Sequence, residues 1–445
     1  MNETGVEKNK GRDLFKSRLG FIVACVGSAV GMGNIWMFPY RAGEFGGAAF
    51  LIPYFIFVVL LGFTGVIGEM AFGRAMRTGP AGAFDKALKM RGKSGGKYLG
   101  LIPVFGSLGI AIGYSVVVGW FLKYLFASVS GELSRVDNVG AYFGELASDF
   151  GSIPWHLAGL AITFTIMIFG ISKGIEKMNK IMMPVFFVLF IVLMVRVFSL
   201  PGSVDGYKYL FVPEWSALGN PKTWVYALGQ AFFSLSLAGS GTIVYGSYLK
   251  DDVNVVYSAR NVAFFDTCAA LLAGVVVIPA VFAFGIDVSA GPPLMFISLP
   301  EVFRQMPFGM VFAVIFFVAV IFAAITSLMN LFETPIEALQ EHFGLSRGKA
   351  VAAIAAVAAI VGVFIESGDS VGAWMDVVSI YVIPLGALMA GIMFFWVCPK
   401  DFVRSEVEKG LDGKLGKWFE PMTKYVFVGV TLVVYILGIL YGGIG

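Results

Sequence analysis

Residues 27–34 read GSAVGMGN, and they interrupt an apolar run that begins near Leu19. Three glycines and an asparagine in eight residues disfavour a continuous helix, because glycine is conformationally free and asparagine competes for backbone hydrogen bonds. Residues 234–241, SLSLAGSG, likewise place small polar residues at the centre of an apolar segment. Both stretches therefore predict helices that are broken near their middle.

The composition indicates an all-α integral membrane protein. The chain has 445 residues, of which 58% are hydrophobic and 14% charged, whereas a soluble domain carries about 25% charged residues. A helix needs about 20 apolar residues to cross a bilayer. The sequence therefore predicts eleven spans in one domain over residues 1–445, with centres near residues 30, 61, 113, 163, 189, 235, 272, 322, 357, 384 and 432.

Lys and Arg residues are distributed unevenly between the two ends of these spans. Of the 32 Lys and Arg residues, only a few lie on the side opposite the N-terminus, namely Arg41, Lys123, Arg135, Arg196, Lys208, Lys222 and Arg304. Because the side richer in Lys and Arg is cytoplasmic, we expect a cytoplasmic N-terminus and an external C-terminus in the cell membrane. This asymmetry explains the net charge of +3 without a nucleic-acid partner.

Residues typical of catalytic and metal centres are scarce. Cys25, Cys268 and Cys398 lie in or at the end of apolar spans, so they do not predict a disulfide framework. His156 and His342 are far apart in sequence and are expected at the membrane interface. No HExxH, CxxC or P-loop pattern occurs. The sequence therefore argues against an enzyme.

The two interrupted segments fall in the first and sixth predicted spans. Small residues in membrane helices usually permit close packing, which explains the spacing of Gly27 and Gly31 but not Asn34. Interrupted helices at matching positions of two halves indicate a transporter binding site, because unwound backbone in a membrane must be buried or line a cavity. We expect a first repeat over residues 1–200, a second over 220–400, and an extra span over 420–445.

Longer motifs resemble the neurotransmitter:sodium symporter family over most of the chain. They are GSAVGMGNIWMFPY (27–40), GGAAFLIPY (46–54), IGEMAFGR (67–74), GYSVVVGW (113–120), GQAFFSLSLAGSG (229–241), YGSYL (245–249) and ITSLMNLFETP (325–335). The resemblance implies eleven helices in two inverted five-helix repeats with broken spans 1 and 6. It also implies a sodium-coupled symporter that imports an amino acid by alternating access through the lipid bilayer.

The resemblance implies two sodium sites. The first would use three carbonyls and two hydroxyls, those of Gly27, Val30, Ala323, Thr326 and Ser327. Sodium is a hard cation that prefers such oxygen ligands, although Ser and Thr hydroxyls in helices also often bond to the preceding turn. The second site would use the Ala29 carbonyl, the Asn34 side-chain oxygen, Ser234 and Asp266.

Asp266 stands out as a carboxylate in the middle of a predicted span. Its burial costs about 2.5–3.5 kcal/mol on insertion scales, so it needs a partner, and no Lys or Arg lies within one helical turn of it. A bound cation would supply that partner, and a protonated or water-bound Asp266 is the alternative. With a fixed carboxylate beside sodium, we expect no chloride requirement.

The same motifs imply a substrate site beside the two breaks. The substrate carboxylate would meet the N–H groups of Met32 and Gly33 and the Tyr114 hydroxyl, although packing alone is the alternative role for Tyr114. The remaining implied residues are Ala29, Ile110, Phe233, Ser234, Ser236, Gly239, Ser327, Asn330 and Leu331. Related monoamine carriers place an aspartate at the position of Gly31, so its absence favours a substrate that brings its own carboxylate.

Gly239, where several relatives have a bulky residue, favours a hydrophobic or aromatic amino acid. Another amine that carries a carboxylate is the alternative substrate. A sensor or channel built on the same fold is the alternative function.

Gating residues are implied on both sides. An ion pair between Arg12 and Glu341 would close the cytoplasmic side, with two unrelated surface charges as the alternative. A Gly-x9-Pro spacing, Gly174 to Pro184, would allow span 5 to unwind and admit water to the first sodium site. On the outer side Asp376 is present, but Met37 replaces the arginine that usually pairs with it.

Overall fold

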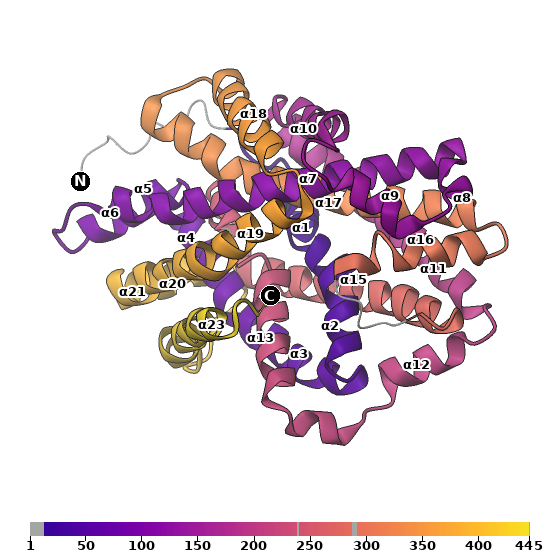
Figure 1. The fold of residues 1–445 in the computed structure, drawn as a ribbon. Coiled ribbons are helices and arrows are strands. Elements are labelled where there is room, and N and C mark those ends of the chain that lie inside the picture. The colour runs from indigo at the N-terminus through magenta and orange to yellow at the C-terminus, as the bar shows by residue number, and fades with distance from the viewer. Residues whose placement is uncertain (1–12, 238–239, 287–291, 445) are drawn as a thin grey trace.

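The computed structural model describes residues 13–237, 240–286 and 292–444, and the regular structure of this part is entirely helical (Figure 1). Two predicted residues, Arg12 and Gly239, lie outside the described residues. The α-helices up to residue 211 are α1 (Arg18–Ala29), α2 (Phe38–Glu44), α3 (Ala48–Leu61), α4 (Ile67–Met76), α5 (Pro80–Lys89), α6 (Gly96–Leu99), α7 (Leu101–Ser130), α8 (Glu132–Arg135), α9 (Val139–Leu146), α10 (Ile153–Met167), α11 (Glu176–Phe198) and α12 (Ser203–Phe211).

The later α-helices form the remainder of the bundle. They are α13 (Pro221–Ser234), α14 (Gly241–Ser247), α15 (Val255–Ala283), α16 (Ser298–Gln305), α17 (Gly309–Phe343), α18 (Arg347–Phe364), α19 (Gly368–Val377), α20 (Ile383–Ile392), α21 (Lys400–Glu408), α22 (Phe419–Pro421) and α23 (Val428–Tyr441). Short π-helical turns extend several of these helices, at η3 (Gly33–Met37), η4 (Gly62–Val66), η5 (Ile171–Ile175), η8 (Val378–Val382), η9 (Met393–Val397) and η10 (Met422–Phe427).

Many of these helices are long enough to cross a bilayer. Within the described residues, eight helical stretches have the length and apolar composition of a membrane span, and the bent pair of residues 18–29 and 33–44 adds a ninth. The predicted centre near residue 163 falls in α10, which is apolar but shorter. The centre near residue 235 falls between α13 and α14. The chain is thus a multi-pass helical protein, while the count of eleven stays a prediction.

The first predicted break is present in the structure. Helix α1 starts at Ser17, whose hydroxyl accepts a hydrogen bond from the Gly20 N–H, a normal N-cap. The helix ends at Val30, whose backbone is extended, and the chain resumes as η3 with a bend of 50°. The glycine-rich stretch therefore ends one half-helix and begins another inside a single apolar segment.

The second break separates α13 from α14. Helix α13 begins with Asn220 as N-cap and Pro221 in its first turn, as is typical of helix starts. Its end is followed by Ser236 and Ser240, both with positive φ angles of 56° and 50°. Such left-handed conformations are uncommon for residues other than glycine, so the helix cannot continue through this stretch.

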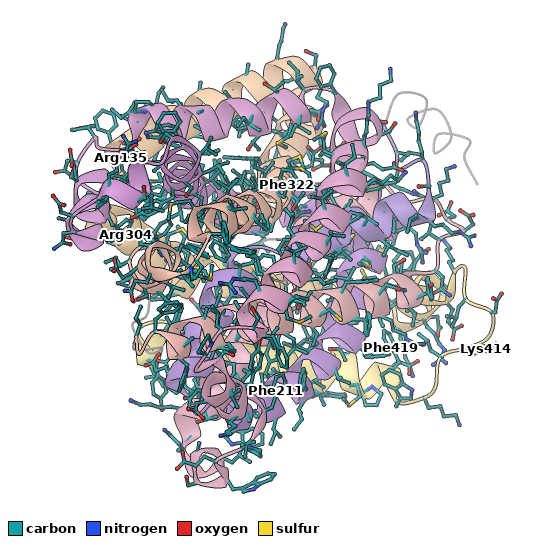
Figure 2. The ribbon with its side chains drawn as sticks, turned by 90° about the vertical axis from the view of Figure 1, so that its right-hand side faces the viewer. Arg135, Phe211, Arg304, Phe322, Lys414 and Phe419 are labelled. Carbon is teal, nitrogen blue, oxygen red and sulfur yellow. The ribbon has the colours of Figure 1, made fainter. Side chains whose placement is uncertain are left out.

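Other helices surround the two broken segments. Helix α1 packs against α11, α15 and α17, while α13 packs against α3 and α14 against α4. Apolar side chains fill most of the space between the helices. Arg135, Arg304 and Lys414 lie at the margins, with Arg135 and Arg304 on one side of Figure 2 and Lys414 on the other. The breaks therefore lie inside protein, where unpaired backbone groups need partners other than water.

Candidate ion and substrate sites

A cavity of about 580 Å³ lies beside the first break, and we call it the central cavity. Most of the residues predicted for the substrate line it, namely Ala29, Met32, Gly33, Ile110, Tyr114, Phe233, Ser236, Ser327, Asn330 and Leu331. Ser234 instead faces Asp266. The structure thus brings residues from α7, α13, α17 and the first break to one site.

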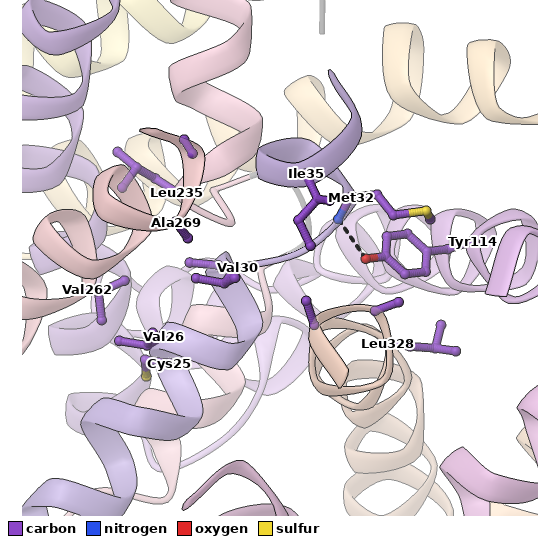
Figure 3. Packing of buried hydrophobic residues seen from close by; sticks show 14 of the residues in the cluster. Cys25, Val26, Val30, Met32, Ile35, Tyr114, Leu235, Val262, Ala269 and Leu328 are labelled. Atoms are coloured by element: carbon purple, nitrogen blue, oxygen red, sulfur yellow. Dashed lines mark hydrogen bonds between the residues drawn. The ribbon is translucent and has the colours of Figure 1, made fainter. Parts of the chain in front are cut away.

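The Tyr114 side chain reaches the broken backbone directly. The Met32 N–H donates a hydrogen bond of 2.9 Å to the Tyr114 hydroxyl, which Figure 3 shows as a dashed line. Gly31 lies at the same point, because a Cβ added there would be 2.8 Å from the Tyr114 hydroxyl and 2.9 Å from Ser327 Oγ. A side chain at position 31 would therefore require the Tyr114 and Ser327 side chains to shift.

The central cavity also has aromatic walls that the sequence analysis did not identify. Trp36, Trp120 and Phe143 line it, and Phe296 packs against all three, with ring-centroid distances of 5.8, 5.7 and 4.9 Å. Tyr114, Val117 and Trp120 follow one another at three-residue spacing on α7 and share one face. That spacing within GYSVVVGW was a usable signal for Trp120.

Asp266 is completely buried on α15 and has only neutral partners among the described residues. Ser234 Oγ donates to both carboxylate oxygens at 2.9 and 2.8 Å, and Asn34 Nδ2 donates to Asp266 Oδ1 at 2.7 Å. The Asn34 side-chain oxygen accepts from the Gly31 N–H at 3.1 Å, which leaves it a second lone pair. The structure thus places Asn34, Ser234 and Asp266 in one cluster with no cationic side chain bound to it.

Residues of the predicted first sodium site meet where α1 ends against α17. Ser327 Oγ donates to the Ser28 carbonyl at 3.2 Å, and Thr326 Oγ1 donates to the Ala323 carbonyl at 2.9 Å. In a continuous helix the Gly31 N–H would donate to the Gly27 carbonyl. Here it donates to the Asn34 side-chain oxygen, so the helical pattern ends. The Ser327 hydroxyl of α17 therefore contacts a carbonyl of α1 at the first break, whereas the Thr326 hydroxyl bonds to the preceding turn of its own helix.

Six residues after Ser327 on α17, Glu333 forms a buried ion pair that the sequence analysis missed. Arg347 donates to both oxygens of Glu333 at 2.9 and 2.8 Å, and the Tyr248 hydroxyl donates to Glu333 at 2.8 Å. The Tyr248 backbone carbonyl also accepts a 3.4 Å hydrogen bond from the Phe15 N–H, just before α1. We call Glu333, Arg347 and Tyr248 the inner cluster.

The predicted pairing of Arg12 with Glu341 stays a prediction, because Arg12 lies outside the described residues, while Glu341 is exposed near the end of α17. Gly174 lies in η5 and Pro184 inside α11, so the segment between them is helical here. A Cβ at Gly174 would be 2.2 Å from the Ile166 carbonyl, which requires glycine. Met37 and Asp376 both line the central cavity.

The expectation of an interfacial position was wrong for His156, which is completely buried. Its Nδ1 lies 3.1 Å from Glu366 Oε1, and its Nε2 lies 3.0 Å from Ser115 Oγ. The Glu366 carboxylate also accepts from the Ser152 N–H. These contacts connect α10, the α18–α19 connection and the turn of α7 that carries Tyr114, and partners so far apart in sequence gave no local signal.

Comparisons with known proteins agree with these features. A model described as the sodium:neurotransmitter symporter family matches residues 12–143 and 135–441. An uncharacterized sodium-dependent transporter of Bacillus subtilis is 39% identical over 320 residues, covering 71% of this chain and 70% of that protein. An uncharacterized sodium-dependent transporter of Methanocaldococcus jannaschii is 32% identical over 451 residues, covering 96% and 90%. The crystal structure of MhsT in complex with L-phenylalanine matches with a TM-score of 0.86 and 34% identity, over 96% of this chain and 100% of that chain.

Proposed function

This chain belongs to the sodium:neurotransmitter symporter family, and we propose that it imports an amino acid together with sodium by alternating access. The family and its relatives are transporters, so the protein is not an enzyme. Its membership implies the use of sodium. What remains to be assigned is the substrate, the sodium sites and the path of the conformational change.

One observation carries the proposal. The central cavity ends on the break of span 1, where backbone groups leave the helical pattern, and Asp266 lies close by, hydrogen-bonded to Asn34 of the same break. A buried carboxylate with only neutral partners favours a cation from solution. A cavity for an organic solute next to such a carboxylate supports coupled transport of the solute and sodium.

We assign the substrate to the hydrophobic or aromatic amino acids. Ile110, Phe233 and Leu331 provide apolar walls, and the structural relative MhsT was crystallised with L-phenylalanine. Gly31 places no acidic side chain beside Tyr114 and Ser327 that could neutralise an amine. This supports a substrate that carries its own carboxylate, and another amine with a carboxylate is the second candidate.

Two sodium sites are proposed. The first comprises the carbonyls of Gly27, Val30 and Ala323 with the hydroxyls of Thr326 and Ser327. The second comprises the Ala29 carbonyl with Asn34, Ser234 and Asp266. Hydrogen bonds already connect α1 to α17 and Asn34 to Asp266 in this arrangement, which supports both assignments. Because Asp266 supplies a fixed negative charge, transport should not require chloride.

The proposed architecture has eleven spans, with inverted repeats over residues 1–200 and 220–400 and an extra span over 420–445. The breaks after α1 and α13, each in the first span of its repeat, support this arrangement. The uneven distribution of Lys and Arg supports a cytoplasmic N-terminus and an external C-terminus in the cell membrane. In this orientation the inner cluster is cytoplasmic.

Opening toward the cytoplasm is proposed to involve three features. The segment from Gly174 to Pro184 would unwind and admit water, and the pairing of Arg12 with Glu341 would break. On the external side, Asp376 would help to close the central cavity without the usual arginine. The fixed φ of proline and the freedom of glycine favour local unwinding between the two residues.

Purified protein can test the substrate and the ion together. A thermal-shift screen of the twenty amino acids, with sodium or with choline, should show stabilisation by hydrophobic or aromatic amino acids only when sodium is present, since ligands that bind the folded state raise its stability. Uptake into proteoliposomes should follow the sodium gradient. Uptake driven equally well by a proton gradient without sodium would contradict the proposal.

A counterflow assay distinguishes a carrier from a sensor or a channel built on the same fold. A carrier exchanges labelled for unlabelled substrate across the membrane without a sodium gradient, whereas a channel cannot concentrate the label and a sensor moves none. Accumulation of label in preloaded proteoliposomes is the expected result. Its absence, in protein that still binds the amino acid, would favour a sensor.

A further inference from the structure

Span 5 contains a completely buried amide oxygen without a hydrogen-bond partner. Asn179 lies in α11 with no exposed surface, and its Nδ2 donates to the Ile175 carbonyl one turn earlier at 2.9 Å. Its Oδ1 has no hydrogen-bond partner among the described residues. Buried polar atoms are nearly always satisfied, and leaving one unsatisfied is unfavourable. This oxygen therefore calls for a partner that protein atoms do not provide.

The unsatisfied oxygen points at the end of α1. A Cβ added at Gly27 would lie 1.9 Å from Asn179 Oδ1 and 3.0 Å from Thr326 Cβ. Gly27 thus makes room for the amide, and the oxygen lies against this residue of the proposed first sodium site. Thr326, a second residue of that site, also borders the Cβ position of Gly27. Because Nδ2 is held by Ile175, the oxygen is the atom of the amide that faces Gly27.

We propose that Asn179 contributes its side-chain oxygen to the first sodium site, either directly or through one water molecule. An amide oxygen is the type of ligand that a hard cation prefers. The bound ion would satisfy the oxygen that is otherwise unpaired in the interior. This inference rests on the proposed function, and it adds a residue of span 5 to a site otherwise built from α1 and α17.

The position of Asn179 links the sodium contact to sodium release. Asn179 lies between Gly174 and Pro184, inside the segment proposed to unwind, and α11 packs directly against α1. A cavity of about 630 Å³ borders the same segment, lined in part by Ser172, Lys173, Gly174 and Lys177. Bound sodium therefore stabilises the helical form of the segment, and unwinding withdraws one oxygen from the ion while the cavity supplies water.

Sodium binding to the purified protein tests the proposal without a transport assay. Melting temperature is measured against sodium concentration at constant ionic strength with choline, and hydrogen exchange of residues 171–184 is compared with and without sodium. Asn179→Ala should lower the apparent sodium affinity by about tenfold or more, the scale for a contact to a charged partner. It should also remove the protection of this segment by sodium.

Two further variants keep the test decisive. Asn179→Asp retains an oxygen and adds charge, so its sodium affinity should equal or exceed that of the parent. Asn261 makes the same intrahelical bond, from Nδ2 to the Tyr257 carbonyl at 2.7 Å, but it is only half-buried on α15. Asn261→Ala therefore removes an equivalent bond without the buried oxygen, and it should leave sodium affinity unchanged.

The outcomes separate this inference from the proposed function. If sodium stabilises the parent and Asn179→Ala equally, Asn179 is only a structural residue and the inference is overturned. A loss of affinity in Asn179→Asp as large as in Asn179→Ala would overturn it as well. If sodium fails to stabilise the parent protein, the proposed sodium coupling itself fails.

Discussion

Two buried carboxylates, Asp266 and Glu333, are both without solvent exposure, yet their surroundings differ. Glu333, in the inner cluster, receives two hydrogen bonds from the Arg347 guanidinium and one from Tyr248. Asp266, beside the central cavity, receives hydrogen bonds only from the neutral groups of Asn34 and Ser234. One acid has a permanent cationic partner, whereas the other has none within the described residues.

The difference indicates two separate tasks. Removing a carboxylate from water costs several kcal/mol, which a fixed guanidinium offsets when its geometry is good. Glu333 can therefore hold α17, α18 and the segment before α1 together as long as Arg347 stays in place. The cost of burying the Asp266 carboxylate can be offset only by a proton or by a cation that binds and dissociates. A coupled transporter requires such a reversible partner.

The largest expected effect is that of Asp266→Asn. The substitution keeps an oxygen ligand but removes the charge that faces the cation. At about 4 Å and an effective dielectric constant of about 20, one unit charge contributes roughly 4 kcal/mol, so sodium affinity should fall roughly 100-fold or more. The sodium affinity is measured from the dependence of the melting temperature on sodium concentration. Asp205→Asn, at an exposed position, serves as a control for the change in net charge.

Chloride and pH sharpen the same prediction. Transport by the parent should not need chloride, and the Asp266→Asn variant should regain some activity when chloride is supplied. Protons compete with sodium for the carboxylate, so the parent should need more sodium at acid pH. If the parent requires chloride, or the substitution leaves sodium affinity unchanged, Asp266 is a structural acid.

A smaller but still large effect is expected from Glu333→Gln. It leaves the Arg347 guanidinium with a neutral partner, and breaking a buried ion pair typically costs about 3–5 kcal/mol. Part of that cost should appear as opening of the cytoplasmic side, with a roughly 50-fold faster maleimide labelling of buried Cys25 in α1. The parent and the variant both carry Cys268→Ser and Cys398→Ser, so that Cys25 is the remaining cysteine of the chain. Unchanged labelling would show that Glu333 does not control this side.

Tyr248→Phe should have an intermediate effect in the same assay. It removes the hydroxyl that donates to Glu333 but keeps the ring that packs edge-on against Phe15. A hydrogen bond to a charged group contributes about 1.5–3 kcal/mol, so Cys25 labelling should rise roughly tenfold. An effect as large as that of Glu333→Gln would mean that the hydroxyl, and not the ion pair, holds the inner cluster together.

The smallest effect is expected from Met37→Arg, in the wall of the central cavity. An arginine there would pair with exposed Asp376 across the central cavity, and exposed ion pairs contribute only about 0–1 kcal/mol. Counterflow exchange should therefore slow by less than about fivefold. Asp376→Ala should reverse the change in the Met37→Arg protein but do little in the parent. Equal effects in both backgrounds would show that Asp376 does not pair with residue 37.

The sequence alone determined the membrane class, the two interruptions and the transporter family. These features are local, because apolar run length and clustered glycine and serine set where helices form and end. Most of the substrate residues that the motifs implied also line the central cavity. The aromatic cluster around Phe296 was missed, because its rings come from segments that are far apart in the sequence.

Only the tertiary structure decided which buried polar groups meet. His156 with Glu366, Glu333 with Arg347, and the unsatisfied oxygen of Asn179 against Gly27 each depend on how distant helices pack, and no local pattern encodes such pairings. The physical reason is that helix breaks follow from backbone preferences over a few residues. The partner of a buried charge is instead set by the geometry of the whole bundle, in which water is absent and each polar group must find its own partner.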